Sequence, residues 1–134
     1  MNVFPTTVSR CATGDETASP ISLTQLAYSG GMSGPYFARV GLLIGRREDS
    51  RGWTSRIGLI DAIATAIRNM VPHEAMIMRY DVHKKDGEKG SESGAEVRIV
   101  LGNGRQVEGL GCDPDTVTAS AKAYVHALNQ LMRA

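Results

Sequence analysis

The chain has 134 residues, of which 42% are hydrophobic and 22% are charged, and its formal net charge is +1. This length suits one domain with its own hydrophobic core and is short for two. Because 15 basic residues are balanced by 14 acidic ones, no global field attracts the chain to nucleic acid or to an anionic membrane. We therefore expect neither a nucleic-acid partner nor a membrane partner.

Targeting features are also missing from the sequence. The longest apolar runs, such as residues 40–44, are far shorter than the roughly 20 residues that span a bilayer. The first residues lack the basic segment and apolar core of a secretory signal, which favours a cytoplasmic location. Cys11 and Cys112 fit neither a metal-ligand spacing nor a disulfide framework, so we expect a structural or incidental role for both.

The chain divides into a polar segment and a repeated segment. Residues 1–20 are mostly short polar residues without a sustained period, which predicts a flexible arm. Residues 21–134 are predicted to form a single domain of two similar units, at 21–72 and 73–134, because neither unit would bury its apolar face alone. The repeat has a constant offset of 57 positions without a gap, and matched pairs include Ala38 and Ala95, Gly52 and Gly109, and Trp53 and Leu110.

Each unit is predicted to contain three strands and a helix. Alternating apolar residues predict strands near residues 23–28, 37–44 and 50–55, and again near 80–83, 95–101 and 105–109. Helical spacing predicts helices from about Gly58 to Met70 and after Asp113-Pro114-Asp115, where Asp113 is expected to cap the helix. The fold class is therefore α+β, with two βββα units whose helices cover one face of an antiparallel sheet.

Catalytic and metal-binding motifs are absent. His73, His83 and His126 do not pair with another ligand type at helical spacing. No nucleophile elbow, phosphate-binding Walker loop or His-Glu-x-x-His motif occurs. We expect no catalytic residues, no metal site and no cofactor.

Two glycine-bearing turns, at residues 52–58 and 109–111, precede the two predicted helices. A helix start offers unpaired N–H groups to a carboxylate or phosphate, and glycine permits close approach of a ligand. Asp61 and Asp113 stand near these helix starts and would accept the ammonium group of an amino acid. Turn geometry alone would also explain the glycines. The same arrangement of a glycine and an acidic residue near the helix start occurs in both units, however, and this favours a site of the size of an amino acid.

RNA binding is a further alternative. Gly109-x-Gly111 and the residues after it loosely resemble the end of a double-stranded RNA-binding domain, and residues 84–89 form a charged loop. That family places a lysine cluster at the start of its last helix, where this chain has Asp113-Pro114-Asp115. Aspartates repel phosphates, so we regard RNA binding as the least favoured hypothesis.

The segment from Gly109 to Asn129 resembles the end of the C-terminal regulatory domain of 2-isopropylmalate synthases and citramalate synthases, the LeuA allosteric or dimerisation domain. Tyr80-Asp81-Val82-His83 and Ala95-Glu96-Val97-Arg98-Ile99 follow the order of that family. Its Gly-Pro-Val-Asp-Ala turn corresponds to Gly58-Leu59-Ile60-Asp61-Ala62 here. The resemblance implies two βββα units, dimerisation and, as in most members, binding of leucine or isoleucine at the dimer interface as a feedback inhibitor.

The resemblance implies no catalysis by this chain. In these synthases acyl transfer occurs in a separate metal-dependent barrel of about 250 residues or more, which 134 residues cannot contain. Met1 followed by an unrelated arm favours a free-standing regulatory module over a fragment. We expect a homodimer that binds a branched-chain amino acid or a related small acid. The alternative is a ligand-free interaction module that pairs with itself or with a separate synthase.

Candidate ligand-binding residues follow from the two helix starts and the resemblance. Arg56 replaces an expected glycine of the first turn, and it would close the pocket or bind a carboxylate. Aromatic residues that look exposed support dimerisation, because interfaces are rich in aromatic side chains; they are Tyr28, Tyr36, Phe37 and Trp53. The candidate site residues are Arg56, Gly58, Ile60, Asp61, Ile63, Gly109, Gly111 and Asp113.

Overall fold

A computed structural model describes residues 20–30, 32, 34–85 and 94–132. The predicted arm, apart from residue 20, and most of the predicted loop at 84–94 lie outside these residues. The described elements in chain order are β1 (Ile21–Ser29), β2 (Tyr36–Ile44), β3 (Arg47–Ser55), α2 (Leu59–Met70), β4 (Met76–Lys85), β5 (Gly94–Gly102), β6 (Gln106–Asp113) and α3 (Thr116–Met132).

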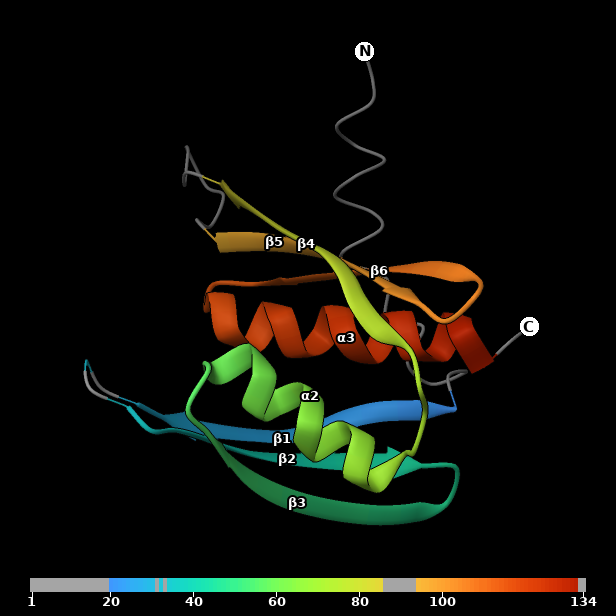
Figure 1. The fold of residues 1–134 in the computed structure, drawn as a ribbon, viewed down its shortest axis with the longest axis horizontal. Coiled ribbons are helices and arrows are strands. Elements are labelled where there is room, and N and C mark those ends of the chain that lie inside the picture. Colours follow the sequence, from blue (N-terminus) through green and yellow to red (C-terminus); the bar gives the residue numbers. More distant parts are fainter. Residues whose placement is uncertain (1–19, 31, 33, 86–93, 133–134) are drawn as a thin grey trace.

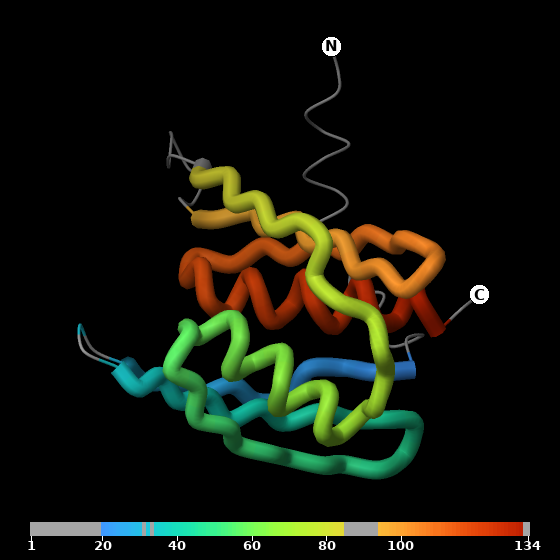
Figure 2. Tube along the Cα trace, in the orientation of Figure 1, coloured from blue at the N-terminus to red at the C-terminus, as the bar shows by residue number. Residues whose placement is uncertain are grey.

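The strands form two antiparallel sheets, ordered β1-β2-β3 and β4-β5-β6. Figure 1 shows both helices between the two sheets. The predicted α+β class and the repeated βββα pattern are confirmed, and each unit has its own three-stranded sheet. Figure 2 shows how the chain leaves α2 and crosses to β4 in the opposite sheet.

The hydrophobic core lies between the sheets and the helices. Alternate residues of the two central strands are fully buried, including Val40 and Leu42 in β2 and Val97 and Ile99 in β5. Helix α2 packs on β2 and β3, whereas α3 packs on β5 and β6 and also contacts β1 and α2. Because α3 touches both units, its sequence carries small buried residues on several sides rather than one narrow apolar stripe.

Glycines in β6 allow α3 to approach its sheet closely. A Cβ added at Gly109 would lie 2.2 Å from the carbonyl oxygen of Ala123 and 2.3 Å from the backbone nitrogen of Ala127. At Gly111 the corresponding distances are 2.2 Å to the Ala119 oxygen and 2.5 Å to the Ala123 nitrogen. Any side chain at these two positions would push the helix away from the strand.

The prediction of a constant 57-residue offset between the two units is wrong for their third strands. Ile44 pairs with Arg47, three residues further along, whereas its counterpart Leu101 pairs with Val107, six residues further along. The second hairpin extends by one residue pair and then turns through three residues instead of two. As a result Gly52 is exposed in β3, while Gly109, its counterpart in the sequence, is buried beneath α3.

No helix among the described residues is long and apolar enough to cross a bilayer. Cys112 in β6 is disulfide-bonded, which its spacing in the sequence did not lead us to expect, and Cys11 lies outside the described residues.

Candidate functional site

Both helices begin at the same end of the molecule, beside the carboxyl ends of β1 and β3 (Figure 1). The predicted residues Arg56, Gly58, Ile60 and Asp61 lie together there because they form the turn into α2 and its first turn. Asp113 precedes α3 at this same end.

Ser55 organises the turn into α2. Its Oγ accepts hydrogen bonds from the backbone N–H groups of Ile57 (2.9 Å) and Gly58 (3.4 Å). Its hydroxyl donates to Oδ2 of Asp61 at 2.7 Å. The other oxygen of Asp61 has no hydrogen-bond partner among the residues that the structure describes. Sequence reasoning missed Ser55, although a serine just before a helix start is a typical sign of a side chain that binds the turn backbone.

The first turn of α2 has no side-chain cap. Gly58 is the N-cap residue, and it has no side chain to cap the N–H groups of the first turn. The first helical bond runs from the Ala62 N–H to the Gly58 carbonyl at 3.1 Å, so the preceding N–H groups of the helix lack helical partners. A Cβ added at Gly58 would meet nothing within 4 Å. The positive end of α2 is therefore open to an anion.

Side chains of both polar and apolar character surround this helix start. Arg56 is exposed, and Ile57 is 81% exposed. Ile60 and Asp61 are half-buried in the first turn of the helix. Ile63 is only 2% exposed and belongs to the core. Of the candidates in α2, Ile60 and Asp61 therefore reach the surface and Ile63 does not.

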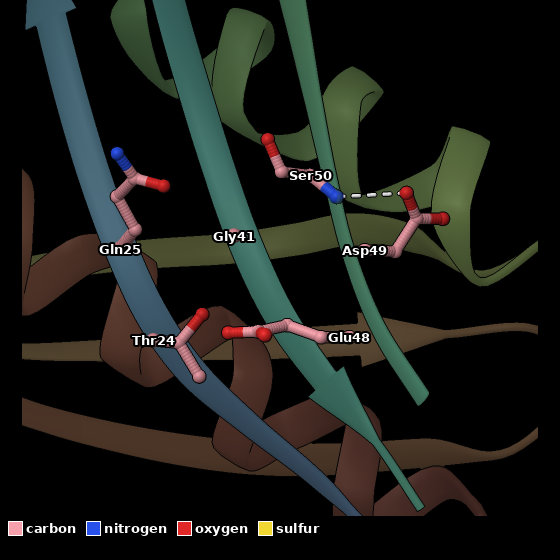
Figure 3. Close-up of a pocket in the computed structure, with 6 residues that line it drawn as sticks. All are labelled: Thr24, Gln25, Gly41, Glu48, Asp49 and Ser50. Atoms are coloured by element: carbon pink, nitrogen blue, oxygen red, sulfur yellow. Dashed lines mark hydrogen bonds between the residues drawn. The ribbon is translucent and has the colours of Figure 1, made fainter. Parts of the chain in front are cut away.

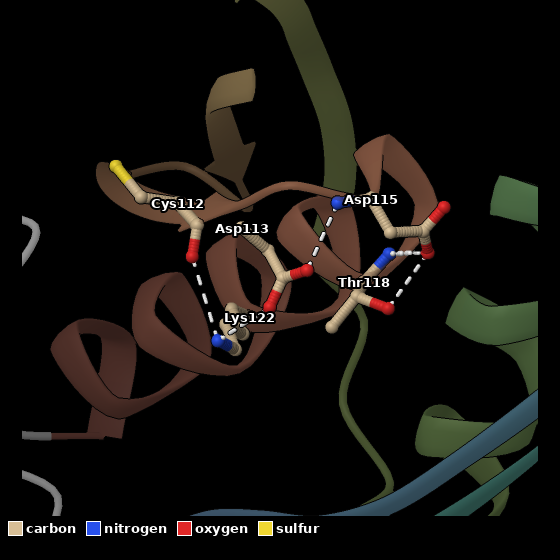
Figure 4. Close-up of polar contacts among 5 residues, drawn as sticks. All are labelled: Cys112, Asp113, Asp115, Thr118 and Lys122. Carbon is tan, nitrogen blue, oxygen red and sulfur yellow. Dashed lines mark hydrogen bonds and ion pairs between the residues drawn. The ribbon is translucent and has the colours of Figure 1, made fainter. Parts of the chain in front are cut away.

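The start of α3 differs because its own side chains occupy it (Figure 4). Oδ2 of Asp115 accepts hydrogen bonds from the N–H (3.0 Å) and the hydroxyl (2.7 Å) of Thr118, as an N-cap residue does. Oδ1 of Asp113 accepts the N–H of Asp115 at 2.9 Å, and Lys122 Nζ lies 2.9 Å from Oδ2 of Asp113. The predicted cap, Asp113, therefore supports the actual cap, Asp115.

Tyr28 links the first unit to this second helix start. Its hydroxyl donates to Oδ1 of Asp115 at 2.7 Å, and this hydrogen bond, together with burial, raises the pKa of Tyr28. Burial acts to raise the pKa of Asp115, but hydrogen bonds from Thr118 and Tyr28 outweigh it and hold that pKa below the ordinary value. Asp115 is thus a charged carboxylate with its partners already within the chain.

Gly109 and Gly111 do not join the residues at the start of α2. Both lie in β6 beneath α3, where the helix backbone fills the space that a side chain would need. Their packing explains why glycine is required there. Contact with a ligand at these two positions stays a prediction.

The sequence profile of the LeuA allosteric (dimerisation) domain family matches residues 8–132. The chain belongs to this family. The 2-isopropylmalate synthase of Methylobacterium nodulans is 41% identical over 122 residues, which are 90% of this chain and 22% of the relative. That of Bradyrhizobium sp. (strain ORS 278) is 40% identical over 116 residues, which are 84% of this chain and 21% of the relative.

The chain thus spans only 21–22% of the length of these relatives. The resemblance inferred from the sequence is confirmed, and the match supports a regulatory or dimerisation role for this LeuA domain. The matched part of the relatives is the allosteric domain, which is consistent with a role outside catalysis.

A hollow of about 300 Å³ lies on the LeuA domain away from the predicted site (Figure 3). Its lining residues are Thr24, Gln25, Gly41, Glu48, Asp49 and Ser50. Asp49 is already paired there, with Arg47 at 3.2 Å and with the Ser50 N–H at 2.7 Å. The Ser50 N–H holds the pKa of Asp49 below its ordinary value. No lining residue of the hollow is a hydrophobic one.

In the part of the chain that the structure describes, no set of three or more His, Cys, Asp or Glu side chains is placed to bind a metal ion. Of the histidines, His126 accepts the Leu110 N–H at Nδ1 (2.9 Å), and His73 contacts the hydroxyl of Tyr124 through Nε2 (3.0 Å). Both histidines therefore bind neighbouring groups of the fold.

Proposed function

We propose that this LeuA domain is a non-catalytic regulatory module that forms a homodimer and binds a branched-chain amino acid at the start of α2. One observation carries the choice of site: the first turn of α2 is uncapped, whereas Asp115 and Asp113 occupy the start of α3. The family is described as an allosteric domain, which supports the binding of a small-molecule effector. The open helix start supplies the chemistry that an amino acid needs.

Each part of an α-amino acid has a matching group at this helix start. The free N–H groups of the first turn and the exposed guanidinium of Arg56 suit the carboxylate. The unpartnered carboxyl oxygen of Asp61 suits the ammonium group. Ile57 and Ile60 offer apolar surface to an aliphatic side chain. Open space over Gly58 lets the ligand approach the backbone.

We infer different tasks for the remaining candidates. Ile63, Gly109 and Gly111 support the site from the core, since they pack inside the fold. Asp113 orders the neighbouring helix start through Asp115 and Lys122. The ligand therefore touches Arg56, Gly58, Ile60 and Asp61 directly.

Exposed aromatic residues support the homodimer. Tyr28 is 39%, Phe37 37% and Trp53 42% exposed, while Tyr36 is half-buried. Such side chains bury a large area at low entropic cost when two proteins associate.

We propose the same cytoplasmic location that the sequence favours. We also propose a separate synthase as a second partner.

A ligand-free interaction module is the second candidate function. The hydrogen bond between Ser55 and Asp61 favours it, because this bond already gives the aspartate a structural task. In that case the first turn of α2 binds only water, and the exposed apolar residues serve association alone.

A thermal-shift screen of the purified chain separates the two functions. A ligand at a hundred times its dissociation constant stabilises the folded state by about 2.7 kcal/mol, which raises the melting temperature by several degrees. We expect L-leucine, L-isoleucine or L-valine to raise it and D-leucine and L-lysine to leave it unchanged. An unchanged melting temperature with all amino acids and 2-keto acids would favour the interaction module.

A further inference from the structure

Every hydrogen-bonding position of the Ser55 hydroxyl is in use. A serine hydroxyl has one hydrogen to donate and two lone pairs that accept. Ser55 ends β3 and is only 4% exposed. Its Oγ accepts the N–H groups of Ile57 and Gly58, at 2.9 Å and 3.4 Å, and its hydrogen goes to Oδ2 of Asp61 at 2.7 Å. Oδ2 of Asp61 is therefore an acceptor, and the carboxylate is tied to the end of the strand.

This arrangement differs from the common use of a carboxylate at a helix start. In a capping box, the acidic side chain three residues after the N-cap accepts the N–H of the N-cap residue. Asp61 stands three residues after the N-cap Gly58, but Ser55 already accepts the Gly58 N–H. Asp61 is therefore not used as a cap, and its second oxygen has no hydrogen-bond partner within the described ranges of the chain.

Ser55 also divides the backbone N–H groups of the turn. It accepts those of Ile57 and Gly58, whereas the N–H groups of residues 59–61 precede the first helical bond, which runs from Ala62 to Gly58. The N–H groups of residues 59–61 suit a ligand carboxylate, and the second oxygen of Asp61 suits a positive charge. The two parts of a ligand would thus meet separate groups.

Only one of these groups distinguishes an amino acid from a keto acid. A 2-keto acid shares the carboxylate and the aliphatic side chain of the corresponding amino acid, but it has a carbonyl oxygen in place of the ammonium group. The helix N–H groups and the apolar surface serve both compounds equally. Discrimination between them therefore depends on Asp61, and on what holds Asp61 in place.

We propose that Ser55 is a positioning residue that holds Asp61 so that the site selects an α-amino acid over the 2-keto acid with the same side chain. The inference rests on the proposed binding of an amino acid at the start of α2. With Oδ2 held by Ser55, the second oxygen accepts an ammonium group and repels a carbonyl oxygen. Without the hydroxyl, the Gly58 N–H loses its partner, and Asp61 turns back to accept it as in a capping box.

Calorimetric titration of the full chain with L-leucine and with 4-methyl-2-oxopentanoate, the keto acid of the same carbon skeleton, tests the inference. The measured quantity is the ratio of the two dissociation constants. We expect the wild type to favour L-leucine at least about tenfold and Ser55→Ala to reduce this ratio at least about fivefold. Thr54→Ala is the matched control, because it removes a hydroxyl from the neighbouring, exposed position, and it should keep the wild-type ratio.

The Asp61→Asn background shows whether Ser55 acts through Asp61. In that background Ser55→Ala should leave the ratio within about twofold, because no charge remains to be positioned. Ser55→Cys is the second variant if Ser55→Ala does not fold, since a thiol is of similar size but donates only weakly. The ratio should fall in Ser55→Cys as well.

The results separate the inference from the proposed function. An unchanged ratio in Ser55→Ala, including a case in which both affinities fall equally, would overturn the positioning role and leave the proposed function standing. Equal affinity of the wild type for the two compounds would overturn the selectivity and leave the amino-acid site standing. A wild-type chain that binds none of L-leucine, L-isoleucine and L-valine would overturn both.

Discussion

Asn129, near the end of α3, exchanges two hydrogen bonds with the backbone of Ile21, the first residue of β1. The Asn129 side-chain nitrogen donates to the Ile21 carbonyl at 2.8 Å, and the Ile21 N–H donates to Oδ1 of Asn129 at 3.0 Å. Asn129 is 4% exposed and Ile21 is fully buried. One amide thus ties the last helix of the second unit to the first strand of the first unit.

Asn129→Leu should lower the free energy of unfolding by about 2–4 kcal/mol, because it leaves the N–H and carbonyl of Ile21 buried without partners. Urea denaturation measures the change. Asn69→Leu is the control, since Asn69 is exposed on α2, and it should change stability by about 0.5 kcal/mol or less. Equal effects of the two substitutions would show that the Asn129 bonds add nothing to stability.

Gly109→Ala and Gly111→Ala should each destabilise the fold by about 3 kcal/mol or more, because the new methyl group collides with the backbone of α3. Gly58→Ala is the matched control. Its backbone is extended, with φ 167°, and nothing lies within 4 Å of an added Cβ. Thermal unfolding of the three variants checks this ranking. A stable Gly109→Ala protein with a normal melting temperature would contradict the packing of α3 on β6.

Local patterns predicted most of the fold. Apolar and polar residues alternate in the sequences of β2 and β5, and this pattern predicts strands with one buried face. In the fold alternate residues of both strands are buried, including Val40 and Val97. The predicted hairpin after Leu101 is confirmed by Gly104, whose φ of +79° suits a tight turn. The candidate residues at the start of α2 lie together in the fold because they are adjacent in the chain, and their contact with a ligand stays a prediction.

Contacts between distant residues could not be predicted in this way. Asn129 looks like an ordinary polar residue of a helix, and only the fold places it 3.0 Å from the Ile21 nitrogen. The paired glycines of β6 suggested a ligand turn, whereas in the fold they face the backbone of α3. The three-residue slip in the third strand was hidden because the stretch from that strand to the helix is three residues shorter in the second unit, so the helices return to the 57-residue offset.

Asp115→Ala should cost about 1–2 kcal/mol of stability, because Asp115 caps α3 through Thr118. The pKa of Asp115 is lowered in the fold, so its contribution is present above the ordinary value of 3.8 and is lost as pH falls through the folded value. The free energy of unfolding should therefore depend less on pH in the variant than in the wild type when the pH is lowered through this range. Asp81→Ala, at an exposed position on β4, should leave the curve unchanged, and a similar loss there would contradict the capping role.

His73 should make the protein less stable in mild acid. Burial and the charge of Arg68 lower the pKa of His73 below its ordinary value of 6.5, so the unfolded chain binds the proton more readily. Stability is therefore full above pH 6.5 and falls as pH drops below it. Urea midpoints at pH 7.5 and 5.5 measure the effect. His73→Gln should reduce the difference, whereas His83→Gln, at an exposed position, should keep it.

The binding of L-leucine to Asp61→Asn, followed by calorimetry alongside the melting temperature, tests the central claim most directly. Asparagine can still accept the Ser55 hydroxyl but lacks the charge for an ammonium group, so affinity should fall at least about tenfold while the fold and dimer persist. Asp49→Asn, in the polar hollow of the first sheet, should bind like the wild type. A lower melting temperature with unchanged leucine affinity in Asp61→Asn would contradict the claim and make Asp61 a structural residue.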